Sequence, residues 1–223
     1  MTNNTVPRIV EIIGPAGAGK TTLCQALSRG CEFIHLGNFP DVRKISAAPF
    51  FIWNGLQILP ALRVLPQRNS RKLTRREFAW LSILNGWPHV LQKELKYKKT
   101  IILDQGPVYL LTELGEFDSE SLQDHVIEIA WQGIYERWST ALDMIIWLDA
   151  TDRCLLDRIN ARQKEHPIKN ESAEAIYKFL SRSRNAYEQI IANLSAYRPD
   201  MKILRFDTSK KTPAQIVNQL LGV

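Results

Sequence analysis

The sequence predicts an α/β fold in which helices cover both faces of a five-stranded parallel sheet. Three observations support this fold class: short apolar segments with the composition of buried strands recur along the chain, helical segments lie between them, and a glycine-rich turn joins the first strand to a helix. Chains of this kind form parallel sheets with right-handed crossovers. The 223 residues are enough to bury such a core without disulfides or a structural metal.

The predicted strands are nearly continuous runs of β-branched and aliphatic residues, as expected where both faces of a parallel sheet are covered. They extend over residues 8–13, 32–36, 100–103, 144–148 and 202–206.

Helices are predicted over residues 20–29, 75–96, 119–138, 152–163, 172–196 and 213–221. Thr212 and Pro213 form a favourable N-cap and first-turn pair for the last helix, and Thr151 can cap the helix that begins at Asp152. The segment between the second and third strands, about residues 40–98, is too long for a loop in a compact domain, so we expect a helical insertion there.

Composition and charge exclude several classes of protein. With 45% hydrophobic and 23% charged residues, the chain has the balance of a soluble globular protein. The net charge of +6 favours anionic partners such as phosphorylated small molecules, but it is too small to indicate nucleic acid. The cysteines and histidines have no metal-ligand spacing. The first residues are polar and lack the apolar core of a signal peptide, so we expect a cytoplasmic location.

The strongest motif is Gly-Pro-Ala-Gly-Ala-Gly-Lys-Thr at residues 14–21, which matches the phosphate-binding loop (P-loop) G-x-x-x-x-G-K-[ST] between a strand and a helix. Its glycines and small alanines let successive backbone N–H groups point at phosphate oxygens, and the helix N-terminus adds partial positive charge. Lys20 can reach the β- and γ-phosphates of ATP, and the Thr21 hydroxyl can bind Mg²⁺. The residues predicted here to bind nucleotide are Gly14, Pro15, Ala16, Gly17, Ala18, Gly19, Lys20, Thr21 and Thr22.

A second candidate is Asp104, which directly follows the strand at residues 100–103 in the sequence Asp-Gln-Gly-Pro. A P-loop protein needs a carboxylate near the metal or the nucleophile at this edge of the sheet. Asp104 can orient Mg²⁺ or accept a proton from a substrate hydroxyl. The alternative is a simple turn, because Asp-x-Gly-Pro also favours one.

A third candidate is the arginine pair Arg158 and Arg162, whose spacing puts both on one face of the predicted helix. Positioned arginines stabilise the charge of a transferring phosphoryl group, so we expect a phosphate-closing lid at about residues 153–170. The alternative is a solvated helix face paired with neighbouring acids.

Two further features have a structural interpretation. Tyr177, Phe179 and Tyr187 recur at helical spacing and are assigned to core packing. The loop at residues 207–213 follows the last strand and can cradle a base, although solvent exposure explains its composition equally well.

Together these motifs resemble the nucleoside and nucleotide kinase branch of P-loop proteins, especially thymidylate kinases and deoxynucleoside kinases. The resemblance spans nearly the whole chain and includes Ile-Trp-Leu-Asp-Ala at residues 146–150 and Arg-Ile-Asn-Ala-Arg at residues 158–162. It implies one domain over residues 1–223 with a three-layer P-loop NTPase fold, a helical substrate-side insertion and an arginine-bearing lid. It also implies that Arg158 and Arg162 contact ATP and the transferred phosphoryl group, and that Thr208 lies near the adenine.

Two positions depart from the family. Gln105 stands where the family usually places an arginine after the acid, and residues 36–40 read Leu-Gly-Asn-Phe-Pro where thymidylate kinases have Glu-Pro-Gly-Gly. Loss of a phosphate-facing guanidinium argues against a nucleoside monophosphate as the acceptor.

The sequence therefore predicts a kinase that transfers the γ-phosphoryl group of ATP·Mg²⁺ to a hydroxyl or phosphate of an unidentified small molecule. Lys20, Asp104, Arg158 and Arg162 are the predicted catalytic residues, with Thr21 and Asp104 serving the metal. GTPases and transporter-type ATPases are disfavoured, because the chain has neither Asn-Lys-x-Asp nor Leu-Ser-Gly-Gly. Nucleic-acid binding ranks low.

The alternative is a nucleotide-gated ATPase or binding module whose insertion docks on a partner or a membrane surface. An apolar stretch at residues 49–66 precedes a basic segment, and such a combination favours anionic interfaces. We favour a helical substrate arm packed on the sheet over this membrane contact. The basic residues are Arg68, Arg71, Lys72, Arg75 and Arg76.

Overall fold

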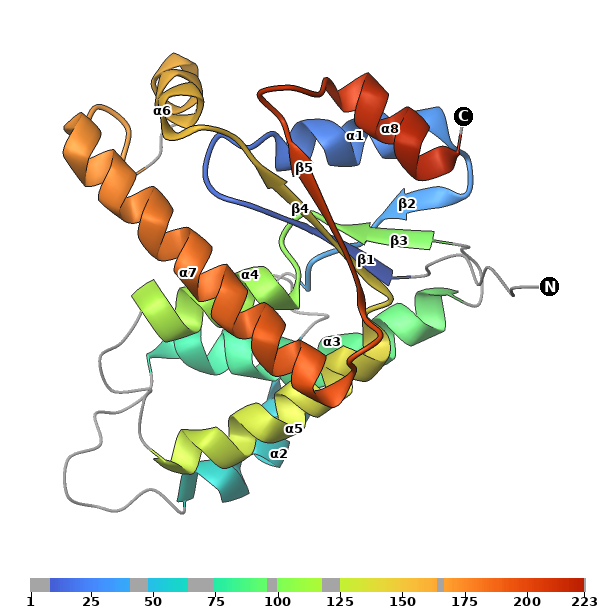
Figure 1. Cartoon of the computed structure of the whole chain (residues 1–223). Coiled ribbons are helices and arrows are strands. Elements are labelled where there is room, and N and C mark those ends of the chain that lie inside the picture. Colours follow the sequence, from blue (N-terminus) through green and yellow to red (C-terminus); the bar gives the residue numbers. More distant parts are fainter. Residues whose placement is uncertain are drawn as a thin grey trace.

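The computed structural model describes residues 9–40, 48–63, 74–95, 100–117, 125–163 and 167–222. These form a five-stranded, fully parallel sheet with the strand order β2-β3-β1-β4-β5 (Figure 1). The predicted strands are all present, although β2 begins later than expected and β4 and β5 each end on an aspartate. The strands are β1 (Ile9–Ile13), β2 (Ile34–Leu36), β3 (Thr100–Leu103), β4 (Met144–Asp149) and β5 (Lys202–Asp207).

The helices agree with the sequence prediction over most of the described chain. The prediction missed α4, and it made the helix after β4 too long, because this helix ends at Ala161. The helices are α1 (Lys20–Gly30), α2 (Ala48–Arg63), α3 (Arg75–Leu95), α4 (Pro107–Thr112), α5 (His125–Ala141), α6 (Asp152–Ala161), α7 (Ala173–Tyr197) and α8 (Pro213–Leu221), and a π-helical turn, η2 (Glu113–Phe117), follows α4.

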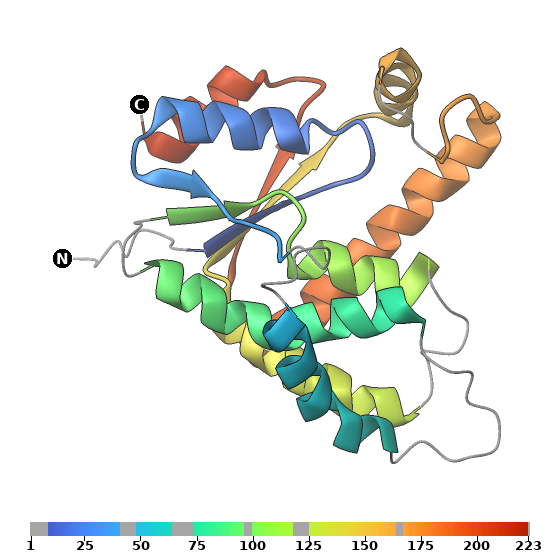
Figure 2. The same ribbon diagram turned by 180° about the vertical axis from the view of Figure 1, so that it is seen from behind.

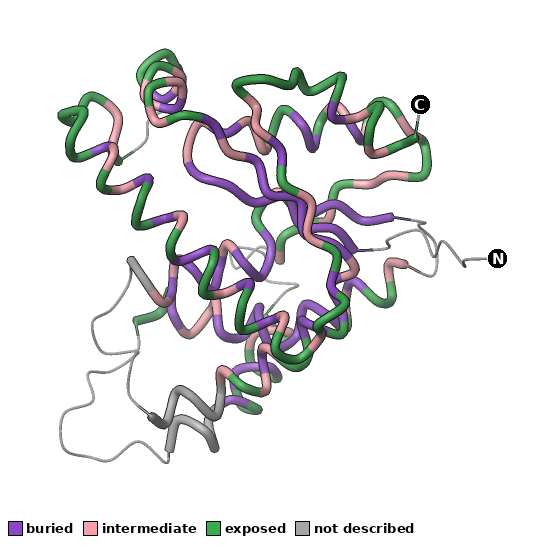
Figure 3. The backbone as a smooth tube through the Cα atoms, in the orientation of Figure 1, coloured by how far each residue is buried: buried purple, intermediate pink, exposed green. Residues whose placement is uncertain are grey.

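The sheet has a hydrophobic core on each face, because alternate residues of a strand point to opposite sides. Val10 and Ile12 of β1 face α1, α6 and α8, whereas Ile9 and Ile13 face α3, α4 and α5. Figures 1 and 2 show these two helical layers on either side of the sheet, and Figure 3 shows how deeply the central strands are buried. The three-layer α/β architecture predicted from the sequence is therefore confirmed.

The predicted insertion is helical where the structure describes it, and α2, α3 and α5 pack together beneath the sheet (Figure 2). Trp138 of α5 donates its indole N–H to the Leu84 carbonyl of α3 at 2.8 Å. On α2, Ile52, Trp53 and Leu56 are exposed by 60%, 66% and 54%. No helix in the described part of the chain is long and apolar enough to cross a membrane. Arg68, Arg71, Lys72 and residues 164–166 of the predicted lid lie outside the described residues.

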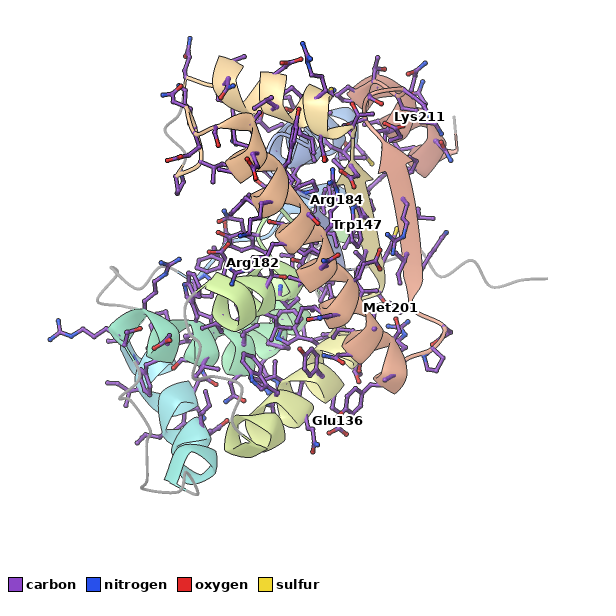
Figure 4. The ribbon with its side chains drawn as sticks, turned by 60° about the vertical axis from the view of Figure 1, so that its left-hand side comes forward. Glu136, Trp147, Arg182, Arg184, Met201 and Lys211 are labelled. Atoms are coloured by element: carbon purple, nitrogen blue, oxygen red, sulfur yellow. The ribbon has the colours of Figure 1, made fainter. Side chains whose placement is uncertain are left out.

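A salt-bridge cluster fastens α7 to the end of β4. Arg184 donates to both carboxylate oxygens of Asp149 at 2.8 and 3.0 Å and to Asp152 at 2.6 Å. Figure 4 shows Arg184 on α7 where this helix runs alongside β4. The cluster holds the carboxyl end of β4 and the start of α6 in fixed relation to α7, which matters because the candidate site is built at this edge of the sheet.

Candidate functional site

The loop at residues 14–19 connects β1 to α1 and is packed tightly against its neighbours. Gly14 has φ 144°, and a side chain there would overlap the Leu148 carbonyl oxygen. Gly17 has φ 83°, and a Cβ there would lie 3.0 Å from the Leu155 carbonyl oxygen of α6. Both positions therefore require glycine, since an L side chain is strained at such φ and also lacks space. The loop curls between the end of β4 and α6.

Lys20 begins α1 and folds its side chain back over this loop. Its ammonium group donates to the carbonyl oxygens of Gly14 at 2.7 Å and Pro15 at 3.1 Å. Burial lowers the pKa of Lys20 from 10.5 to about 8, with Asp104 opposing the shift and the charge of Arg162 adding to it. A cation held in this way, beside a glycine-rich loop at a helix N-terminus, is a suitable partner for a phosphate chain.

Thr21 and Asp104 meet although they are far apart in the sequence. The strands that precede them, β1 and β3, are neighbours, so their carboxyl ends lie side by side. The Thr21 hydroxyl donates to a carboxylate oxygen of Asp104 at 2.8 Å. Mg²⁺ prefers hard oxygen ligands and binds one or two carboxylates together with phosphate and water oxygens, so this pair fits an Mg²⁺–triphosphate complex. Among the described residues no group of three or more His, Cys, Asp or Glu side chains forms a site for a metal alone.

Arg158 links α6 to the loop after β5. Its guanidinium donates to the Thr208 hydroxyl and carbonyl, both at 2.9 Å, and to the Gly17 carbonyl at 3.4 Å. Thr208 is held in turn by its backbone N–H, which donates to the Asp149 carbonyl at 2.7 Å. Arg158 therefore joins the P-loop to the loop that the resemblance places near the adenine.

The expectation that Arg158 and Arg162 share a helix face is wrong. Because α6 ends at Ala161, Arg162 lies just beyond the helix in an extended conformation, with φ −68° and ψ 138°. Both side chains still line the same pocket, and Arg162 is exposed.

Glu11 is a polar residue of this region that the sequence analysis missed. Its side chain is 0% exposed, and it accepts hydrogen bonds from the backbone N–H groups of Gly106, Val108 and Tyr109 at 3.0, 2.9 and 3.0 Å. Burial raises the pKa of Glu11 from 4.5 to about 8, and the three N–H groups oppose this rise because they favour the ionised form. An acid within an otherwise apolar strand was the sequence signal that could have revealed it.

All of these loops open into one pocket of about 1030 Å³. Every residue predicted to bind nucleotide, metal or phosphoryl group lines it, including Thr22 and Thr208. Phe179 and Tyr187, which we assigned to packing, also line it, although Tyr187 is buried and packs edge-on against Trp147 at 5.9 Å between ring centroids. The lining residues that the sequence analysis did not single out for the site include Arg76, Tyr109, Glu113 and Ser183.

Comparisons with known proteins agree with this architecture. The family model described as "AAA domain" matches residues 10–178. None of the curated protein sequences is significantly similar to the chain.

Among solved structures, the chain is similar to deoxyadenosine kinase from M. mycoides with the products dCMP and dCDP bound, at a TM-score of 0.52 and 17% identity over 96% of this chain and 100% of that chain. The same enzyme with bound dCTP gives a TM-score of 0.50 and 15% identity, with the same two coverages. Thymidylate kinase from Candida albicans gives 0.54 and 17%, over 96% of this chain and 89% of that chain. At these identities the similarity establishes a shared fold. The chain therefore belongs to the AAA domain family and has the fold of the P-loop nucleoside and nucleotide kinases.

Proposed function

We propose that this protein is a small-molecule kinase that transfers the γ-phosphoryl group of ATP to a hydroxyl group. The observation that carries the proposal is the hydrogen bond of 2.8 Å between Thr21 and Asp104, which line the same pocket as Lys20. This arrangement supplies a phosphate cradle, a cation and oxygen ligands for Mg²⁺ within a single site.

The roles of the residues follow from their positions. Backbone N–H groups of residues 16–21 hold the phosphates, and Lys20 exchanges its bonds to the Gly14 and Pro15 carbonyls for bonds to phosphate oxygens. Thr21 and Asp104 would hold Mg²⁺, which would supply charge neutralisation on the phosphates. The exposed Arg162 can close over the site from the lid.

The chemical step is an in-line displacement at the γ-phosphorus. The acceptor oxygen forms a bond to this phosphorus while the bond to the β–γ bridging oxygen breaks, so that ADP leaves. The proton of the acceptor hydroxyl passes to Asp104 or to water. Asp104 is suited to either the metal or the proton, because it is partly exposed at the carboxyl end of β3 and lines the pocket.

The lining of the pocket favours a hydroxyl over a phosphate as the acceptor. It includes the aromatic side chains Tyr109, Phe179 and Tyr187. Gln105 stands where the kinases that the chain resembles usually place an arginine, so a phosphate acceptor would lack that guanidinium. A phosphate acceptor carries nearly two negative charges and favours such a cation. Arg76, another lining residue, has its guanidinium 3.5 Å from Glu113.

The proposal is tested by measuring ADP release from ATP·Mg²⁺ with a panel of nucleosides, nucleoside monophosphates, sugars and lipids. At least one hydroxyl acceptor should raise the rate well above the acceptor-free rate, and Lys20→Ala should lower that rate by about a hundredfold or more. Lys202→Ala is the matched control, because Lys202 is an exposed lysine on β5 at the opposite end from the pocket, and it should keep the full rate. No acceptor-dependent ADP with any compound would contradict the proposal.

A further inference from the structure

Glu11 is a buried acid whose position has no explanation in the packing of β1 alone. Its neighbours on the strand are isoleucines and valine, and a hydrophobic side chain would fill the same space. Taking a carboxyl group out of water is unfavourable unless hydrogen bonds compensate it. The compensation comes from a single short segment, because the three backbone N–H groups that donate to Glu11 lie between Gly106 and Tyr109.

The three N–H groups belong to the segment that directly follows Asp104 and Gln105. Val108 and Tyr109 lie in the first turn of α4, where backbone N–H groups have no partner within the helix. Glu11 supplies that partner from a neighbouring strand, and no side chain of the residue before α4 does so. Its two oxygens thus replace the local N-cap that Gly106 cannot provide.

The backbone of Gly106 lies so close to the Glu11 carboxyl group that a side chain would not fit between them. A Cβ on Gly106 would lie 2.5 Å from the Glu11 carboxyl carbon. The glycine therefore allows the backbone of the loop to rest directly on the carboxyl group. Asp104, before this contact in the sequence, accepts a hydrogen bond from Thr21, and Tyr109 and Glu113, after it, line the same pocket as Asp104.

We propose that Glu11 is a positioning residue of the nucleotide site, whose carboxyl group fixes the loop that carries Asp104. The proposal rests on the proposed function, since it assigns Glu11 a role in holding the Mg²⁺-binding pair of Thr21 and Asp104. Glu11 acts through the backbone of residues 106–109, so it touches neither nucleotide nor metal.

Glu11→Gln is the informative substitution because it preserves size. In the protein, one carboxyl oxygen accepts from Gly106 and Tyr109 and the other accepts from Val108. Both oxygens can accept whether the carboxyl group is protonated or ionised, whereas an amide nitrogen only donates. The variant therefore turns at least one of these contacts into a donor facing a donor.

Two measurements on the full chain test the role of Glu11. In Glu11→Gln, hydrogen exchange of the amides at residues 104–112 should accelerate by about tenfold or more, since a lost hydrogen bond lowers local protection. The gain in ATP affinity on adding Mg²⁺ should fall by about tenfold, as expected when an outer partner of a metal ligand is removed. Affinity for ATP without Mg²⁺ should change little, and Asp104→Asn should reproduce the loss of the Mg²⁺ effect.

Asp143→Asn is the matched control. Asp143 also accepts a backbone N–H of β1, from Ile9 at 2.9 Å, but at the other end of the strand. This variant should leave both measurements unchanged. Gly106→Ala perturbs the contact between Gly106 and the Glu11 carboxyl group and should repeat the effects of Glu11→Gln. This second variant keeps the test valid if Glu11→Gln does not fold.

The outcomes separate this inference from the proposed function. Wild-type protein that takes up no ATP with Mg²⁺ would overturn the proposed function and, with it, the nucleotide role of Glu11. ATP binding with unaltered exchange in both Glu11→Gln and Gly106→Ala would overturn the Glu11 proposal alone. Faster exchange with an unchanged Mg²⁺ effect would also overturn it, because Glu11 would then stabilise α4 without positioning Asp104.

Discussion

Lys20 is the residue whose ionisation is coupled most directly to the proposed ligand. Burial lowers its pKa to about 8, so the free protein begins to lose this charge just above neutral pH. Because the folded protein binds fewer protons than the unfolded chain between about pH 8 and pH 10.5, this group makes the free protein more stable as pH rises through that window. Nucleotide binding has the opposite dependence, since a triphosphate favours the protonated ammonium.

The affinity for ATP·Mg²⁺ should therefore fall with increasing pH, by about tenfold per pH unit once the pH exceeds the pKa of Lys20. Calorimetry at pH 8.5 in two buffers with different ionisation enthalpies should detect the proton taken up on binding. Lys20→Met should remove this uptake. An uptake of the same size in Lys20→Met would assign the proton to another group.

At the residue scale, the part of the site that one continuous motif forms was predicted from the sequence. The part that depends on contacts between distant segments was not. The glycines and Lys20 were predictable because their roles depend on an unbroken stretch of sequence. The role of Glu11 was not, because its partners follow a different strand and become neighbours only when β1 and β3 pair. Phe179 and Tyr187 were assigned to packing because helical spacing does not distinguish a residue that lines a pocket from one that fills a core.

At the element scale, the contact between α6 and the loop after β5 holds these two elements together where both line the pocket. Arg158 makes two bonds to Thr208 at 2.9 Å, a geometry that a lysine cannot reproduce. The Arg158 guanidinium therefore links α6 to the loop after β5 and also lines the pocket.

A double-mutant cycle of Arg158→Met and Thr208→Val should show this link. The free energies of unfolding, measured with urea, should be non-additive by about 1 kcal/mol, because the two side chains share a charge-assisted hydrogen bond. Arg153→Met is the control on the same helix, since Arg153 is exposed and paired with Asp157 at 3.9 Å, and it should be additive with Thr208→Val. Additivity in the Arg158 cycle as well would show that the contact does not stabilise the fold.

Element boundaries were predictable where local chemistry sets them. The Thr212 hydroxyl accepts from the N–H of Gln215, and the Gln215 side chain accepts from the N–H of Thr212. Residues close in the sequence therefore determine where α8 starts. By contrast, α4 was missed because Asp-Gln-Gly-Pro also favours a turn, and the cap that stabilises the helix comes from Glu11 on another strand.

At the scale of the whole molecule, the sequence predicted five parallel strands and helices on both faces but not the order of the strands. The order β2-β3-β1-β4-β5 places β1 between β3 and β4, and this arrangement brings the ends of three strands together. The P-loop after β1, Asp104 after β3 and the start of α6 after β4 thereby meet at one edge. Such proximity depends on pairing between distant segments, which local composition does not specify.

The proposed kinase activity depends on residues 14–21 holding a nucleoside triphosphate. Isothermal titration of ATP with Mg²⁺ into the wild-type protein should show saturable binding to one site, and Lys20→Ala should weaken this binding by about tenfold or more without lowering the unfolding temperature of the free protein. Absence of detectable binding of any purine triphosphate to the folded wild-type protein, with Mg²⁺ present, would contradict it.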